Sequence, residues 1–150
     1  MRTFLTVAVA SAAVLAPLAV TAPASAAGTV CTTDKVPAFK KVIDVRPGGV
    51  GKVTRKHPYG AFAGRYTKRK YIEEVDMYVH VPTGKKKTVL FAKNAQICVL
   101  YTSDVGGVKM KRTGLKGLAK AVDHPAMNPQ WGLRFNGKGR ITVAYQIYMP

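Results

Sequence analysis

The chain has 150 residues, of which 24 are Lys or Arg and 7 are Asp or Glu, so its formal net charge is +17. Hydrophobic residues make up 47% of it, enough to build a core, and this excludes a long disordered basic tail. A chain of this length suits a single domain.

The first 26 residues have the features of a secretory signal peptide. Arg2 supplies a positive start, an apolar run from Phe4 to Ala16 follows, and small residues precede the expected cleavage point after Ala26. Two prolines interrupt the helix that the alternative, an uncleaved membrane anchor, would need. Removal of this segment leaves residues 27–150 with 23 basic and 7 acidic residues, a net charge of +16. We therefore expect an exported domain without an integral membrane span.

Export determines how the two cysteines, Cys31 and Cys98, are interpreted. An even number of cysteines in an oxidising compartment favours one disulfide bond. The spacing is not C-x-x-C, and no histidine stands beside either cysteine, which argues against a metal site or a reactive thiol.

Alternation of apolar and polar residues predicts that most of the remaining chain is β-strand. Strands are expected at residues 39–45, 50–55, 75–81, 88–92, 97–101 and 108–111, separated by Gly- and Pro-containing turns. Residues 82–84 are expected to turn the chain so that strand 75–81 pairs with strand 88–92 in a hairpin. The expected pairs are Met77 with Val89, Val75 with Phe91, and Glu73 with Lys93.

One segment has helical rather than strand periodicity. Apolar residues recur at three- and four-residue spacing in a short helix that begins at Leu115 and ends at Val122. Thr113 is the expected N-cap, and Pro125 prevents the helix from continuing. Gly117 weakens the helix by up to about 1 kcal/mol relative to Ala, so packing on a sheet must order it.

The C-terminal segment predicts a second hairpin around residues 137–139. Its expected pairs are Phe135 with Ile141, Leu133 with Val143, and Trp131 with Tyr145, with the last strand continuing through Ile147 and Met149. Together these elements predict a mostly β, single-domain antiparallel sandwich or small barrel with one short helix, over residues 27–150.

Few residues suggest catalysis. Ser103 is the only serine after the signal segment and lacks a nucleophile-elbow context. Glu74, Asp76 and His80 share one parity of the strand expected at 75–81, a spacing suited to a carboxylate pair or a metal, although such residues usually form only a solvated face. The sequence therefore predicts a binding protein rather than an enzyme, with no metal and no cofactor.

The excess positive charge is the clearest functional signal, because solubility requires only a few net charges and +16 adds self-repulsion. Basic residues alternate with aromatic ones in one stretch without acids, a pattern that suits a polyanion. The expected polyanion-binding residues are Arg55, Lys56, Arg65, Lys68, Arg69, Lys70, Tyr59 and Tyr66, with a secondary basic cluster at Lys85, Lys86 and Lys87. Outside the cell the partner would be a cell-wall polymer, extracellular nucleic acid or an acidic glycan.

Two alternatives remain open. The first is a secreted inhibitor of a hydrolase, which would insert the turn that begins at Arg46 or the Lys85 loop into an acidic protein. The second is a small ribonuclease that uses His57, His80 or His124 for proton transfer while lysines stabilise the developing charge. No spacing in the sequence brings two of these histidines together.

Overall fold

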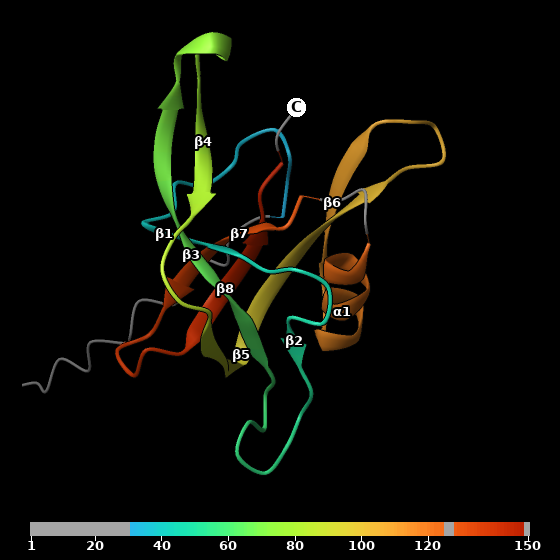
Figure 1. Ribbon diagram of the computed structural model, residues 1–150. Helices are drawn as coiled ribbons and strands as arrows, with labels where there is room; N and C mark the ends of the chain where they lie inside the picture. The colour runs from blue at the N-terminus through green and yellow to red at the C-terminus, as the bar shows by residue number, and fades with distance from the viewer. Residues whose placement is uncertain (1–30, 125–127, 149–150) are drawn as a thin grey trace, which may run out of the picture.

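A computed structural model describes residues 31–124 and 128–148 of the chain. These residues form a mostly β domain with one α-helix, as predicted (Figure 1). The expected signal segment and Met149 lie outside the described residues, and none of the described helices is long and apolar enough to span a membrane. The strands are β1 (Lys41–Asp44), β2 (Val50–Gly51), β3 (Ala61–Ile72), β4 (Met77–Pro82), β5 (Lys87–Thr102), β6 (Val108–Thr113), β7 (Gln130–Phe135) and β8 (Ile141–Gln146); α1 is Leu115–Asp123, and the 3-10 turn η1 is Glu73–Val75.

Five of these strands close into a ring in the order β1, β3, β5, β8, β7 and back to β1. Four of the five contacts are antiparallel, and β5 with β8 is parallel, so the sheet is mixed rather than wholly antiparallel. The parallel pair follows from the long connection through β6, α1 and β7, which carries the chain back to start β8 beside β5.

The core fills this ring. Trp131 is fully buried, and its ring lies 5.3 Å from that of Phe62, which lies 5.0 Å from Phe91. Helix α1 covers the core with Leu118 and Val122. The predicted helix is confirmed, but Thr113 is not its cap: Gly114 occupies the N-cap position without a side-chain hydrogen bond. A Cβ at Gly117 would collide with the Thr113 hydroxyl, which explains the glycine inside the helix.

The C-terminal hairpin exists, but its register is only partly as predicted. Phe135 pairs with Ile141, whereas a bulge then shifts the register by one, so that Leu133 faces Ala144 and Trp131 faces Gln146. The extra residue turns Tyr145 away from the core cluster and lets Ala144 face it.

The hairpin predicted between residues 75–81 and 88–92 is wrong. Strand β4 pairs instead with β3, with Met77 opposite Ile72, and β5 pairs with β3 further along, with Val89 opposite Phe62. The reason is the length of β3, which spans 12 residues and pairs successively with β4 and then β5 along one side. The segments expected at 88–92 and 97–101 belong to one strand, β5, and the segment at 50–55 keeps only two strand residues.

The N-terminal described segment lies against the outside of the ring. The predicted disulfide joins Cys31 to Cys98 of β5, with a Cα–Cα distance of 5.4 Å. The Tyr145 hydroxyl donates to the carbonyl of Thr32, and the Phe39 ring lies 5.5 Å from that of Tyr145. This segment thereby covers the outward side chains of β5, β7 and β8.

Candidate functional site

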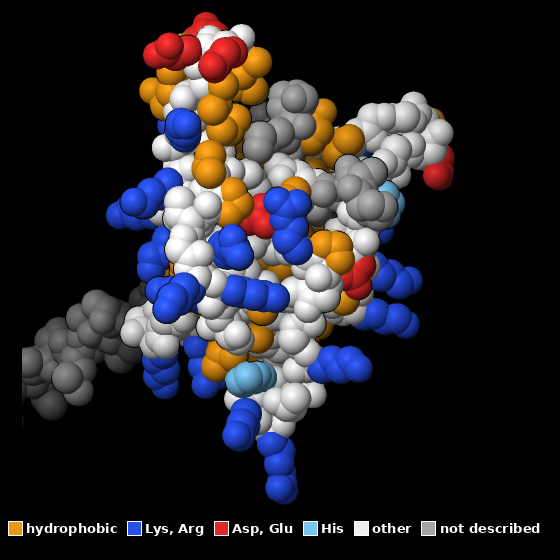
Figure 2. Space-filling model, viewed as in Figure 1, with side chains coloured by type: hydrophobic (Ala, Val, Ile, Leu, Met, Phe, Trp, Pro, Cys, Tyr) orange, Lys and Arg blue, Asp and Glu red, His pale blue; other side chains and the backbone are white. Residues whose placement is uncertain are grey.

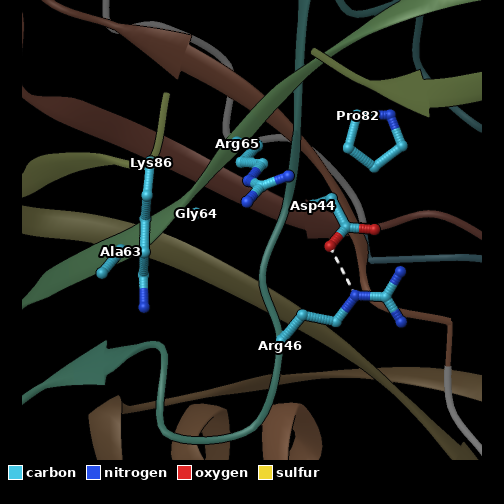
Figure 3. Close-up of a pocket in the computed structure, with 7 residues that line it drawn as sticks. All are labelled: Asp44, Arg46, Ala63, Gly64, Arg65, Pro82 and Lys86. Atoms are coloured by element: carbon cyan, nitrogen blue, oxygen red, sulfur yellow. Dashed lines mark hydrogen bonds and ion pairs between the residues drawn. The ribbon is translucent and has the colours of Figure 1, made fainter. Parts of the chain in front are cut away.

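A hollow of about 310 Å³ opens on the outer surface where β1, β3 and the link into β5 meet (Figure 3). Three cations from three chain segments line it: Arg46 after β1, Arg65 on β3, and Lys86 just before β5. Gly64 also lines it, and a Cβ at this position would collide with the backbone carbonyl of Asp44, so glycine lets β3 lie this close to β1. The remaining lining residues are Asp44, Ala63 and Pro82.

Asp44 is the one carboxylate of the hollow and is almost fully buried, at 5% exposure. Its neighbours Ile43 and Val45 point into the core, so strand alternation directs Asp44 outward. Arg46 Nε donates to Asp44 Oδ1 at 2.7 Å, while the Arg46 side chain stays 70% exposed. The carboxylate thus holds Arg46 in place and leaves the outer edge of its guanidinium open to solvent.

The hollow carries an excess of positive charge. Arg65 and Lys86 make no ion pair within 4 Å to any of the residues that the structure describes, so only Arg46 is compensated. Figure 2 shows Lys and Arg side chains across the middle and lower parts of this face, whereas most of the visible acidic side chains lie at its upper extremities. Three of the seven acids, Glu73, Glu74 and Asp76, lie at the far end of the β3–β4 hairpin.

The structure brings together two groups that the sequence treated separately. Arg65, from the predicted polyanion-binding set, and Lys86, from the secondary cluster, share the hollow. Arg55 and Lys56 instead lie in the loop between β2 and β3, at the other end of the molecule from the β3–β4 hairpin (Figure 1). The predicted set is therefore distributed along the molecule.

The basic triplet of β3 divides between the two faces of the β3–β4 hairpin. Arg69 lies over the ring of Tyr78 at 4.0 Å, on one face. Lys68 and Lys70 alternate with it and point to the other face, opposite Val81 and Val79.

The two predicted tyrosines both pack against the core. Tyr59 and Tyr66 are half-buried, and burial raises the pKa of Tyr66 above its ordinary value. Lys41 and Lys87 each place Nζ 6.0 Å from the Tyr66 ring centre. Tyr66 therefore packs against the core beneath two ammonium groups, rather than offering a free stacking surface.

Sequence reasoning assigned no binding role to Asp44, Gly64 or Lys41. The combination of a buried carboxylate with an exposed Arg two residues later was a usable signal, because an Asp at the end of an otherwise apolar strand needs a partner when it is buried. Nothing local indicated that Lys86 would lie beside Arg65.

The predicted carboxylate–histidine face does not form. Glu73–Val75 is a 3-10 turn and Asp76 has a positive φ of 47°, so the strand that would align Glu74 and Asp76 with His80 begins only at Met77. The Tyr71 hydroxyl donates to Asp76, and this hydrogen bond, followed by burial, raises the pKa of Tyr71. Within residues 31–124 and 128–148, no three His, Cys, Asp or Glu side chains are grouped to hold a metal.

The three histidines lie on different parts of the fold. His57 is in the loop before β3, His80 is on β4, and His124 follows α1. The Thr67 hydroxyl oxygen lies 3.1 Å from His80 Nδ1, and burial and then the charge of Arg69 lower the pKa of His80. His80 is thus held against Thr67 at the base of the β3–β4 hairpin.

Comparison of the chain with protein-family models, with curated proteins and with solved structures finds no match. Any functional assignment therefore depends on the chemistry of the residues themselves.

Proposed function

We propose that this chain is a secreted, non-catalytic binding module that attaches electrostatically to a polyanion, with the hollow formed by Arg46, Arg65 and Lys86 as its principal anion site. The observation that carries the proposal is the set of three cations around one buried carboxylate. A negatively charged group entering the hollow meets two cations that no acidic side chain of the described residues neutralises.

Geometry and charge both suit a phosphate-bearing or similarly charged polymer. Guanidinium groups bind phosphate and carboxylate oxygens in pairs, and an arginine already held by a carboxylate loses little freedom on binding. The hollow opens on the outer surface, so an anionic group of a polymer can reach the cations that line it. The net charge of +16 on residues 27–150 draws such polymers toward the whole domain.

Salt-dependent binding to a short DNA duplex of known charge density tests this proposal. Three phosphate contacts predict a slope of about −2.7 for log K against log salt, or about a 40-fold loss between 50 and 200 mM salt. Arg65→Gln with Lys86→Gln should reduce the slope by about 1.8. The matched control is Lys109→Gln with Arg112→Gln, which removes the same two charge types from exposed positions on β6. Equal effects of the two double variants would refute a localised site.

One observation favours the protein-directed alternative, an inhibitor of a hydrolase. The Arg46 turn and the Lys86 link, two segments suited to insertion into an acidic cleft, lie side by side at the hollow. A pull-down from culture medium separates the two functions, because surface electrostatics is screened within a few Å at about 0.5 M salt. A stoichiometric protein partner retained at that salt would replace the polyanion proposal with the inhibitor.

A further inference from the structure

A second cavity, of about 490 Å³, opens at one end of the strand ring, where β1 begins and β7 ends. We call it the rim pocket. Its lining combines apolar with basic side chains: Phe39, Leu133 and Phe135, and Lys40, Lys41 and Arg134. Leu133 and Phe135 face the core, whereas Arg134 between them points outward by strand alternation, so the pocket spans the inner and outer sides of β7.

The two phenyl rings of the rim pocket are held in place by packing. A Cβ at Gly132 would lie 2.2 Å from Cδ2 and 2.4 Å from Cγ of Phe39, so only glycine lets this ring rest on β7. The Phe39 ring also lies 5.5 Å from that of Tyr145, and Phe135 packs against the core. Each phenyl ring is half-buried and lines the pocket with the surface that remains. The pocket therefore offers aromatic surface in a fixed position.

A cation stands next to each phenyl ring. Lys41 Nζ lies 5.1 Å from the centre of the Phe135 ring, and the guanidinium carbon of Arg134 lies 5.7 Å from that of Phe39. Lys40 and Lys41 make no ion pair within 4 Å to any acidic side chain of the described residues. Aromatic surface and uncompensated positive charge thus occur together in one cavity.

We infer that the rim pocket takes an unpaired base of a single-stranded nucleic acid, while the cations around it bind the phosphates of that strand. The inference rests on the proposed function and names the class of polyanion. Stacking of bases on aromatic side chains and neutralisation of phosphates by Lys and Arg are the two contacts by which proteins hold single strands. The bases of a duplex are already paired and stacked, so the pocket selects a single strand.

The chemistry of the lining favours a base over the sugar ring of an acidic glycan. Every described side chain that lines the pocket is apolar or cationic, so none of them accepts a hydrogen bond from a sugar hydroxyl. A sugar in the pocket would lose hydrogen bonds to water without replacement, whereas a base buries its flat face and keeps its polar edge toward solvent. A wall polymer of polyol phosphates has no ring to place there.

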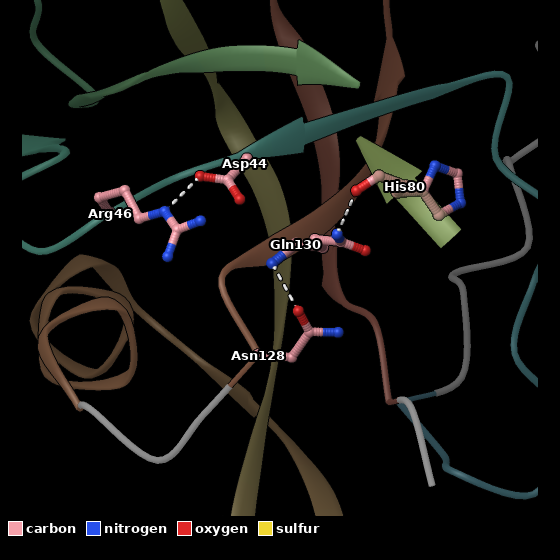
Figure 4. Close-up of polar contacts among 5 residues, drawn as sticks. All are labelled: Asp44, Arg46, His80, Asn128 and Gln130. Atoms are coloured by element: carbon pink, nitrogen blue, oxygen red, sulfur yellow. Dashed lines mark hydrogen bonds and ion pairs between the residues drawn. The ribbon is translucent and has the colours of Figure 1, made fainter. Parts of the chain in front are cut away.

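The rim pocket and the hollow lie along the same strand. Lys41 and Asp44 are three residues apart on β1, about 10 Å along the strand. Near the hollow, β7 is fixed beside β1: Asp44 lies opposite Gln130, and Gln130 Nε2 donates to the His80 carbonyl at 2.8 Å (Figure 4). The spacing between the two cavities is therefore set by paired strands.

Positive charge continues from the hollow to the rim pocket. Lys86 of the hollow is followed by Lys87, whose Nζ lies 6.0 Å from the centre of the Tyr66 ring. Lys41 of the rim pocket places its Nζ at the same distance, 6.0 Å, from that ring. One strand of nucleic acid can thus place a phosphate in the hollow and a base in the rim pocket.

Two oligonucleotides of equal length and charge test the inference by fluorescence anisotropy: oligothymidylate, and the same backbone with an abasic site in place of every base. The base-bearing strand should bind about fivefold more tightly or better at the same salt, which is the effect of stacking a single base. Equal affinities overturn the inference and leave the electrostatic proposal standing. Failure of both strands to bind overturns both.

A matched pair of variants locates the stacking site. Phe39→Leu keeps an apolar side chain on Gly132 but removes the ring, so it should bring the ratio of the two affinities from about fivefold to near unity without weakening the abasic strand. Phe135→Leu should act in the same direction. The control is Tyr101→Leu, which removes another ring with a lysine beside it, Lys111 Nζ at 4.7 Å, near the opposite end of β5.

Three results would contradict the rim pocket as the stacking site. The first is an unchanged ratio in both phenylalanine variants, and the second is an equal loss for the two strands. The third is an equal loss for a heparin fragment in Phe39→Leu, which would mean that the pocket takes sugar rings. A base analogue whose fluorescence is quenched by stacking gives an independent readout with the unmodified chain, and unquenched emission on binding would also overturn the inference.

Discussion

Replacement of Gly49 by Ala tests how the turn after β1 holds the hollow together. Gly49 is buried, and a Cβ at this position would lie 2.6 Å from a methyl of Val45, 2.7 Å from the carbonyl oxygen of Arg46 and 2.8 Å from that of Ala63. Ordinary contacts of a Cβ begin at about 3.4 Å, so the turn and β3 must separate by more than half an ångström. Two backbone atoms are involved, and a side-chain rotation cannot relieve them.

The expected loss of stability follows from two opposing effects. Overpacking costs about 1–3 kcal/mol, and stretching the bonds from Gly49 N to Arg46 O and from Ala63 N to Gly49 O costs roughly 1 kcal/mol each. Ala also lowers the conformational entropy of the unfolded chain, which stabilises the folded state by only about 0.4–1 kcal/mol. The clash dominates, and we expect a net loss of about 2–4.5 kcal/mol, with Arg46 displaced from the hollow.

Urea unfolding measures this change directly, because Trp131 is the only tryptophan and is fully buried, so its fluorescence reports the core. A loss of this size lowers the midpoint by about 1–3 M. Gly137→Ala is the control, since a Cβ there meets no atom within 4 Å and the backbone φ is not positive. Equal midpoints for the two variants would show that the turn yields at little cost and would refute the reasoning.

Two further predictions concern the frame around the site. Cys31→Ser with Cys98→Ser should lower the free energy of unfolding by about 4 kcal/mol, because the disulfide closes a loop with a sequence separation of 67; an unchanged urea midpoint would contradict this. The lowered pKa of His80, caused first by burial and then by Arg69, means that the unfolded chain takes up the proton more readily. Stability should therefore fall as pH drops below about 6.5 toward the folded value, and His80→Gln should flatten that fall relative to the stability of the same variant at pH 8; an unaltered slope would exclude His80 as the cause.

The local pattern of apolar and polar residues was sufficient to predict those elements whose contacts are made by residues close in the sequence. The helix from Leu115 and the turn before Ile141 were predictable because a 3.6-residue period and a Gly-containing loop are readable within a short window. The bulge that shifts Trp131 by one residue was not, since an extra strand residue leaves no signature in apolar alternation.

Strand β3 shows why the sequence did not predict the strand pairing or the positions of the basic residues. Its first half packs Phe62 into the core, and its second half leaves the body and carries Lys68, Arg69 and Lys70 on two exposed faces. A strand that is buried at one end and solvated at the other has no constant period, so its basic residues resembled a continuous binding stretch. The hollow was missed for a related reason: Arg46, Arg65 and Lys86 meet only through pairings between distant strands.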